Sequence, residues 1–205
     1  MAPKWLEWVQ QLEAIAHIGL TFSDNPYDIE RYEKLRRIAA EMAAHHTNED
    51  PEILEKLFTR LPDYPTPKVD VRGIVISDGK ILLIRERTDG KWAPPGGWAD
   101  VGDPPAEAVI REVEEEAGYI VRVTKLAALY DRNKHMHEPN PLHIYKLFFL
   151  CEVIGGAENP NHETSDVAWF APDDLPPLSL LRITHYQIER MFVHHNNPDL
   201  PTEYD

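Results

Sequence analysis

The sequence predicts an α/β domain with a small helical region in front of it. Three segments with helical spacing of apolar residues precede a proline-rich stretch at 62–67. After that stretch, runs rich in β-branched and aromatic residues alternate with helical patterns, which is typical of an α/β fold. A glycine-rich loop then leads into an acidic helix, and this segment carries the longest fixed pattern in the chain.

The N-terminal region contains three predicted helices. Apolar residues recur at helical intervals from Trp5 to Leu20, after Asn25-Pro26, and again after Asp50-Pro51, where an acidic cap followed by proline is a typical helix start. The helices are expected to be too small for a core of their own. We therefore expect a helical region at 1–61 that docks on the next domain or dimerises, a proline-rich linker at 62–68 and an α/β domain at 69–205.

The second domain begins with a predicted β-hairpin. The runs 69–76 and 80–84 flank Ser77-Asp78-Gly79, a strong turn signal. Further strands are expected at 120–130, 142–153 and 166–170, with polar loops at 131–141 and 155–165 between them. A closing helix is expected at 183–194, followed by a loose polar tail.

The acidic helix is predicted to run from Asp103, as N-cap, to Gly118, as a left-handed C-cap. Its apolar residues share one side, while Glu112, Glu115 and Glu116 share another. Such glutamate pairs repel by roughly 0.2–0.5 kcal/mol each, at a helix end whose dipole favours cations. A bound divalent cation would offset this repulsion; a plain solvated acidic face is the alternative.

The residues that frame this helix form a recognisable pattern. Glycine, five residues, an acid, seven residues and then Arg-Glu-Val-x-Glu-Glu-x-Gly resembles the Nudix box, with Gly97 first and Gly118 last. Two positions differ from the family pattern: Asp103 replaces a glutamate that pairs mainly with the box arginine, and Tyr119 replaces an aliphatic residue. The segment 27–32 also resembles the N-terminal extension of a Nudix subgroup that includes CDP-choline pyrophosphatases and ADP-ribose pyrophosphatase-like proteins.

The resemblance implies a Nudix α/β/α sandwich with a mixed sheet, so that 69–205 would be a Nudix hydrolase domain. It also implies a Mg²⁺- or Mn²⁺-dependent pyrophosphohydrolase that cleaves a nucleoside diphosphate linked to another group. CDP-choline is the first expectation for the substrate, and ADP-ribose or the 3′ end of RNA are alternatives. A Nudix-fold regulator that binds ligand without catalysis is the alternative from another class.

The site residues follow from the box and from the polar loops. Glu112 and Glu116 are expected to bind the principal ions, with Glu115 as a further ligand. The resemblance implies that the carbonyl of Gly97, the first box glycine, is a backbone ligand. The expected catalytic residues are Glu115, Glu116, Arg111 and the loop carboxylate Glu163, which is a candidate general base. The expected substrate-binding residues are Arg85, Trp98, Arg132 and Lys134, although the two loop cations could equally lie in a plain solvated loop.

Composition limits the remaining functions. The chain of 205 residues carries a formal net charge of -14, which argues against binding double-stranded nucleic acid or an anionic membrane. No run of about 18 apolar residues and no signal-peptide pattern is found, so a cytoplasmic location is expected. Cys151 is interpreted as a core residue. A small nucleotide substrate and a homodimer are the expected partners.

Overall fold

The structure is a computed structural model that describes residues 3–47, 49–58, 65–100 and 102–205. The chain divides into two compact units. One contains the three N-terminal helices together with residues 139–143, and the other contains Lys68–Glu138 and Ile144–Asp205. Part of the expected linker, 62–64, lies outside the described residues. No helix in the described part of the chain has the length and apolar character needed to cross a bilayer.

The N-terminal unit consists of α1 (Lys4–Phe22), α2 (Pro26–Thr47) and α3 (Pro51–Phe58). The side chain of Asn25 accepts a hydrogen bond from the Tyr27 N–H at 3.0 Å, and Asp50 accepts one from the Glu52 N–H at 2.8 Å. These contacts confirm both predicted helix starts. The expectation that the helices lack a core was wrong, because they enclose a small apolar cluster of Val9, Ala39, Ala40, Ala43, Leu54 and Phe58.

The second unit is built on a mixed sheet of seven strands. In sequence order they are β1 (Lys68–Ser77), β2 (Lys80–Glu86), β3 (Trp92–Ala93), β4 (Tyr119–Asp131), β5 (Ile144–Gly156), β6 (Thr164–Phe170) and β7 (Glu203–Tyr204). The spatial order is β3-β2-β1-β5-β4-β7, and β6 pairs with β2. Parallel pairing of β1 with β5 and of β4 with β7 makes the sheet mixed.

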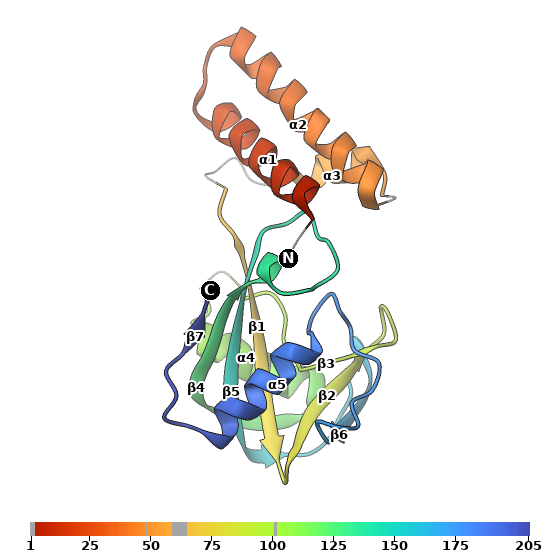
Figure 1. Ribbon diagram of the computed structural model, residues 1–205, viewed down its shortest axis with the longest axis vertical. Helices are drawn as coiled ribbons and strands as arrows, with labels where there is room; N and C mark the ends of the chain where they lie inside the picture. Colours follow the sequence, from red (N-terminus) through yellow and green to blue (C-terminus); the bar gives the residue numbers. More distant parts are fainter. Residues whose placement is uncertain (1–2, 48, 59–64, 101) are drawn as a thin grey trace. The chain divides into compact units, whose positions relative to one another are not determined.

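One helix covers each face of this sheet (Figure 1). α4 (Pro105–Ala117) buries Val109 and Val113 against one face, where Gly73 of β1 leaves the room that Val113 occupies. α5 (His185–Asn196) buries Ile188 and Met191 against the other. The predicted α/β/α sandwich is thereby confirmed.

The pairing of β1 with β2 is confined to the hairpin end. Ile76 pairs with Ile81 and Ser77 with Lys80, and Asp78 and Gly79 have φ values of 50° and 72° in the turn. These left-handed values are what a tight hairpin with a type I′ turn requires.

Over the N-terminal half of β1, the glycine-rich loop takes the neighbouring position instead of β2. The Val71 N–H donates to the Gly97 carbonyl at 2.8 Å, the Gly73 N–H to the Pro95 carbonyl at 2.9 Å, and the Ala99 N–H to Val69 at 3.0 Å. The loop that begins the box is therefore held as an extra strand, and β2 diverges from β1 beside it.

The structure corrects two sequence predictions, one about the start of α4 and one about the C-terminal tail. Pro104, not Asp103, occupies the N-cap of α4, and among the described residues no side chain caps the helix. The tail is not loose, since Glu203 of β7 accepts hydrogen bonds from the Tyr130 hydroxyl and from Arg190, both at 2.7 Å. Gly118 does end α4 as predicted, with φ 78°.

Candidate active site

Arg111 connects the acidic residues at the exposed edge of the box. Its guanidinium lies 3.0 Å from a carboxylate oxygen of Glu112. It also lies 3.3 Å from a carboxylate oxygen of each of three further residues, Glu115, Asp100 and Asp103. Asp103 therefore contacts the box arginine although it is shorter than the glutamate of the family pattern. Because the site is open to solvent, we expect each of these four pairs to contribute little to stability on its own.

Glu116 is the buried acid of the site. Its residue is 5% exposed, and its carboxylate accepts a hydrogen bond from the Gly96 N–H at 2.7 Å. Burial, together with the charges of Glu86 and Glu112, raises the pKa of Glu116 to about 8, although Arg72 and the Gly96 hydrogen bond act in the opposite direction. The positive charge and hydrogen bonds that the protein supplies at this position are therefore not enough to offset the cost of burying the charged carboxylate.

Glu112 lies beside the glycine-rich loop. A Cβ atom added to Gly97 would lie 3.1 Å from a carboxylate oxygen of Glu112, so glycine permits a close approach of backbone and carboxylate. Burial raises the pKa of Glu112, while Arg111 and Arg72 lower it.

Backbone groups of the glycine-rich loop contact both β1 and α4. The Gly97 carbonyl accepts the Val71 N–H and so faces β1. The Gly96 N–H instead faces Glu116. The loop therefore contacts β1 through the Gly97 carbonyl and α4 through the Gly96 N–H.

A buried ion-pair network lies behind the loop. Arg72 donates two hydrogen bonds to Asp70, at 3.0 and 2.7 Å, and one to the Pro94 carbonyl at 3.2 Å. Lys146 donates to the same aspartate at 2.6 Å. Despite burial, the two cations hold the pKa of Asp70 at about 2, while burial lowers the pKa of Lys146 to about 8. The network fixes the end of β1 on which the glycine-rich loop rests.

Glu86 at the end of β2 is a site residue that the sequence reasoning missed. It is 6% exposed, and Arg182 binds it with a distance of 2.6 Å between Nε and Oε1. Its Cα pairs with that of Thr164, whose hydroxyl donates to the Glu116 carbonyl at 3.0 Å. In the sequence, Glu86 stands between Arg85 and Arg87 at the charged end of a predicted strand. No local signal therefore distinguished Glu86 from these two neighbours.

Glu163 directly precedes β6, as the sequence predicted. Its carbonyl accepts the Arg87 N–H at 3.1 Å, which ties it to the end of β2, and its side chain is exposed. The negative charge of Glu163 contributes to the raised pKa of Glu86, after burial and the effect of Asp89. Glu163, just before β6, and Glu86, at the end of β2, therefore lie at the same end of the sheet.

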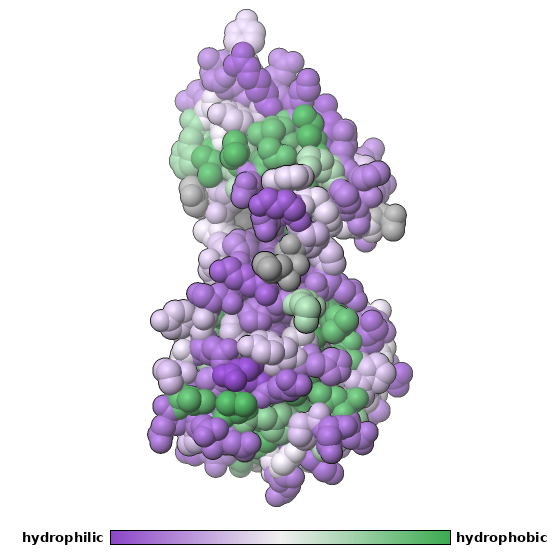
Figure 2. Space-filling model, in the orientation of Figure 1, coloured by the Kyte–Doolittle hydropathy of each residue, from purple (hydrophilic) through white to green (hydrophobic). Residues whose placement is uncertain are grey.

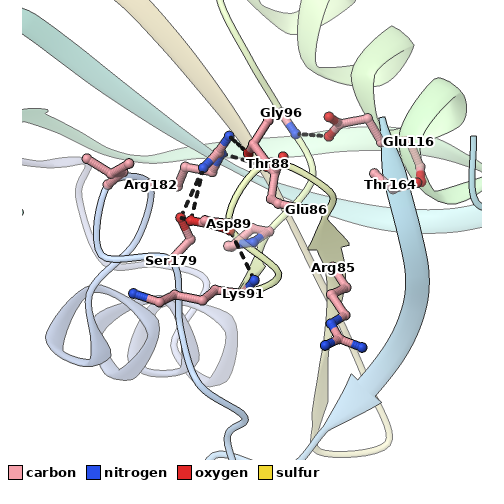
Figure 3. Close-up of polar contacts among 12 residues, drawn as sticks. Arg85, Glu86, Thr88, Asp89, Lys91, Gly96, Glu116, Thr164, Ser179 and Arg182 are labelled. Carbon is pink, nitrogen blue, oxygen red and sulfur yellow. Dashed lines mark hydrogen bonds and ion pairs between the residues drawn. The ribbon is translucent and has the colours of Figure 1, made fainter. Parts of the chain in front are cut away.

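The four predicted substrate-binding residues lie in different places. Arg85 donates to the Gly90 carbonyl at 2.9 Å and points away from Glu116 (Figure 3). Trp98 is 47% exposed, with Lys68 5.9 Å from its ring centroid. Arg132 is 2% exposed and directs its guanidinium at the Leu181 carbonyl, so it is not in a solvated loop.

Lys134 lies at a separate cavity of about 410 Å³ beside the edge strand β7. The cavity wall also includes Leu126, Tyr145 and Tyr204, and no residue of α4 or of the glycine-rich loop. The structure thus separates the two loop cations, Arg132 and Lys134, that the sequence treated as one group.

The donor set suits a hard divalent cation. Carboxylate and carbonyl oxygens are the ligands that Mg²⁺ and Mn²⁺ prefer, and a cation beside Glu116 would favour the charged form that burial disfavours. Among the residues that the structure describes, no three His, Cys, Asp or Glu side chains gather closely enough to hold an ion. Arg111 draws Glu112 and Glu115 to itself, while Glu116 is turned to Gly96.

The chain matches two family models and a curated relative over most of its length. A family model described as the NUDIX domain matches residues 67–192, and one described as a UDP-X-like, N-terminal oligomerisation domain matches residues 3–58. A Bacillus subtilis protein named "Putative ADP-ribose pyrophosphatase YjhB" is 44% identical over 202 residues, which cover 98% of this chain and 97% of that protein.

Two solved structures are similar as well. The crystal structure of a UDP-X diphosphatase has 35% identity and a TM-score of 0.64, covering 98% of both chains. That of an ADP-ribose pyrophosphatase from Streptococcus suis has 38% identity and a TM-score of 0.63, covering 68% of this chain and all of that one. Hydrolases of this family generally use divalent metal ions. The chain belongs to the Nudix family and is a pyrophosphohydrolase similar to ADP-ribose pyrophosphatases.

Proposed function

We propose that the chain hydrolyses a nucleoside diphosphate linked to a sugar, with ADP-ribose as the first candidate. The observation that carries this proposal is the full-length similarity to the Bacillus subtilis relative, which includes the N-terminal helices as well as the Nudix domain. A UDP-linked substrate is the second candidate, because the UDP-X diphosphatase also matches over the full length. CDP-choline, the first expectation from the sequence, is named in none of these relatives.

In this proposal Glu112 and Glu116 hold Mg²⁺ or Mn²⁺, with Glu115 as an outer ligand. The Gly97 carbonyl, the expected backbone ligand, already accepts the Val71 N–H, so it would bind an ion through its second lone pair. The bound ions would neutralise the diphosphate and lower the pKa of an attacking water. Glu163 is exposed at the same end of the sheet and would accept the proton from that water.

Two cations of the chain have separate parts in the proposal. Arg111 holds the Glu112 and Glu115 carboxylates in place by pairing with both of them. Arg72 lies close enough to Glu86, Glu112 and Glu116 for their charges to interact with it. Because Arg72 is buried and bound to Asp70, it would act only as a fixed positive charge behind the carboxylates that hold the ions.

A substrate panel tests the proposed function. ADP-ribose, UDP-glucose, CDP-choline and a short RNA would be incubated with the full-length protein and Mg²⁺ or Mn²⁺, and phosphate would be measured after treatment of the products with phosphatase. We expect ADP-ribose to give the highest kcat/KM and chelation by EDTA to abolish turnover. Faster turnover of CDP-choline would restore the expectation from the sequence, and turnover that persists in EDTA would contradict the metal site.

We also propose that α1 contributes to a homodimer interface. Trp8, Ile15 and Phe22 recur every seven residues along α1 and are 51%, 53% and 69% exposed. Figure 2 shows apolar side chains gathered on the N-terminal helices. Such a stripe is more extensive than the scattered apolar residues of an ordinary surface.

The double variant Trp8→Glu, Ile15→Glu is expected to run as a monomer, because two charges would have to be buried in the interface. Light scattering coupled to gel filtration measures the mass. The matched control is Ile154→Glu, which changes a residue that is 61% exposed on β5 of the other unit and should leave the mass unchanged. A wild-type protein that is monomeric at working concentration would contradict the proposal.

A further inference from the structure

Arg182, outside the box and between β6 and α5, contacts the end of β2 and the turn after it. Besides Glu86, its guanidinium donates to the hydroxyls of Thr88 and Ser179, both at 3.1 Å, and to Asp89 at 3.4 Å (Figure 3). A planar guanidinium is suited to several such fixed hydrogen bonds, whereas an ammonium group is not.

The loop that carries Arg182 is itself fixed. The Ser179 N–H donates to the Trp92 carbonyl at 2.8 Å, and the Trp92 N–H donates to the Pro177 carbonyl at 3.0 Å, which joins the loop to β3. The Ser179 hydroxyl donates to Asp89 at 2.7 Å, and Ser179 is fully buried. Arg182 therefore projects from a rigid support, and the position of its guanidinium is set by the fold.

Glu86 needs such a support because of its neighbours. Glu86 pairs with Thr164 of β6, and the Thr164 hydroxyl donates to the carbonyl of Glu116 at the end of α4. The negative charge of Glu86 repels that of Glu116. Glu163 adds a further negative charge nearby. Without a cation fixed at its Oε1 atom, a carboxylate among these charges would turn away from the box.

We propose that Arg182 is a positioning residue for metal binding: it holds the Glu86 carboxylate beside Glu116, and Glu86 thereby strengthens the attraction of the site for a divalent ion. The inference rests on the proposed metal site at Glu112 and Glu116. Hydrogen-bonding partners outside the ligand set are typically worth about 10- to 100-fold in metal affinity. Glu86 acts here through its charge and its orientation.

The sign of the effect separates positioning from simple charge. If Arg182 acted only as a nearby positive charge, its removal would strengthen the binding of a cation. If it positions Glu86, its removal weakens binding, because the carboxylate is released from the site. The two roles therefore predict opposite changes in affinity.

The experiment measures Mn²⁺ binding to the full-length protein without substrate, by calorimetry and by electron paramagnetic resonance. We expect Arg182→Ala to weaken binding about tenfold, and Arg182→Lys to restore part of the loss by pairing with Glu86 alone. Glu86→Gln should weaken binding to a similar extent. The double variant should lose no more than either single variant, since both remove the same interaction.

Arg190→Ala is the matched control. Arg190 pairs with Glu203 at 2.7 Å in the same unit, so its loss also breaks a partly buried Arg–Glu pair, but it should leave Mn²⁺ affinity unchanged. Thermal unfolding would show that each variant is folded. If Arg182→Ala does not fold, the comparison of Arg182→Lys and Glu86→Gln with wild type still decides the matter.

Unchanged or tighter Mn²⁺ binding in Arg182→Ala, or additive losses in the double variant, would overturn the inference while leaving the proposed function intact. Wild-type Mn²⁺ affinity in both Arg182→Lys and Glu86→Gln would also overturn the inference and leave the proposed function intact. If the wild-type protein itself binds no Mn²⁺, both the metal site and the role of Arg182 are wrong.

Discussion

Replacing Glu116 by glutamine is expected to lower kcat about a thousandfold while leaving the fold intact. The glutamine oxygen still accepts the Gly96 N–H, which now lies 2.7 Å from Glu116, so the loop keeps its anchor. The negative charge that would bind the ion is lost. A thousandfold loss corresponds to roughly 4 kcal/mol of transition-state stabilisation, within the range expected for a metal ion that stabilises developing charge.

Glu114 offers a matched control for this variant. It lies on the same helix but is exposed and outside the site, so Glu114→Gln should leave both turnover and the melting temperature unchanged. Turnover of the preferred substrate would be measured at saturating Mg²⁺ and again at saturating Mn²⁺. Near-wild-type kcat in a folded Glu116→Gln protein with either ion would show that the ion is bound elsewhere.

Replacing Asp70 by asparagine is expected to destabilise the second unit by about 3–5 kcal/mol, the range seen when one partner of a buried ion pair is removed. Asp70 is the acceptor for both Arg72 and Lys146, and these residues are 6%, 3% and 1% exposed. The variant would leave two buried cations without their shared carboxylate. Urea unfolding followed by circular dichroism measures the loss.

The double variant Asp70→Asn, Lys146→Met tests the reason for that loss. Removing the lone ammonium group should recover part of the stability, so the two changes should be strongly non-additive. If the stability lost in the double variant equals the sum of the losses in the two single variants, the network does not couple these residues.

The same aspartate predicts acid sensitivity. Its pKa is about 2 in the folded chain and 3.8 as the ordinary value, so the charged form is favoured in the folded state. This contribution of about 2 kcal/mol is fully present above pH 4 and is lost as the pH falls toward 2. Unfolding free energies measured between pH 6 and pH 2 should fall more steeply for wild type than for Asp70→Asn. Parallel curves would contradict the assignment.

Local rules predicted much of the fold because they act between near neighbours in the chain. Gly118 ends α4 in a left-handed conformation, Asn25 and Asp50 begin their helices, and Asp78-Gly79 forms the hairpin turn. Each of these features depends on a backbone conformation or a hydrogen bond within a few residues. Asp103 is the exception, because Arg111 offers its carboxylate a charged partner and Pro104 takes the cap position.

The sequence by itself determined the family, the acidic helix and the glycine-rich loop, since these are carried by fixed spacing. Only the tertiary structure decided that Glu86 meets Arg182, that Asp70 serves two cations, and that Arg132 is buried while Lys134 lines a separate cavity. These contacts join strands and loops far apart in the chain, so they depend on sheet order and register. The acidic stripe on α4 is a candidate metal site because β1, β2 and the glycine-rich loop enclose one end of it, and no periodicity within the helix could show that.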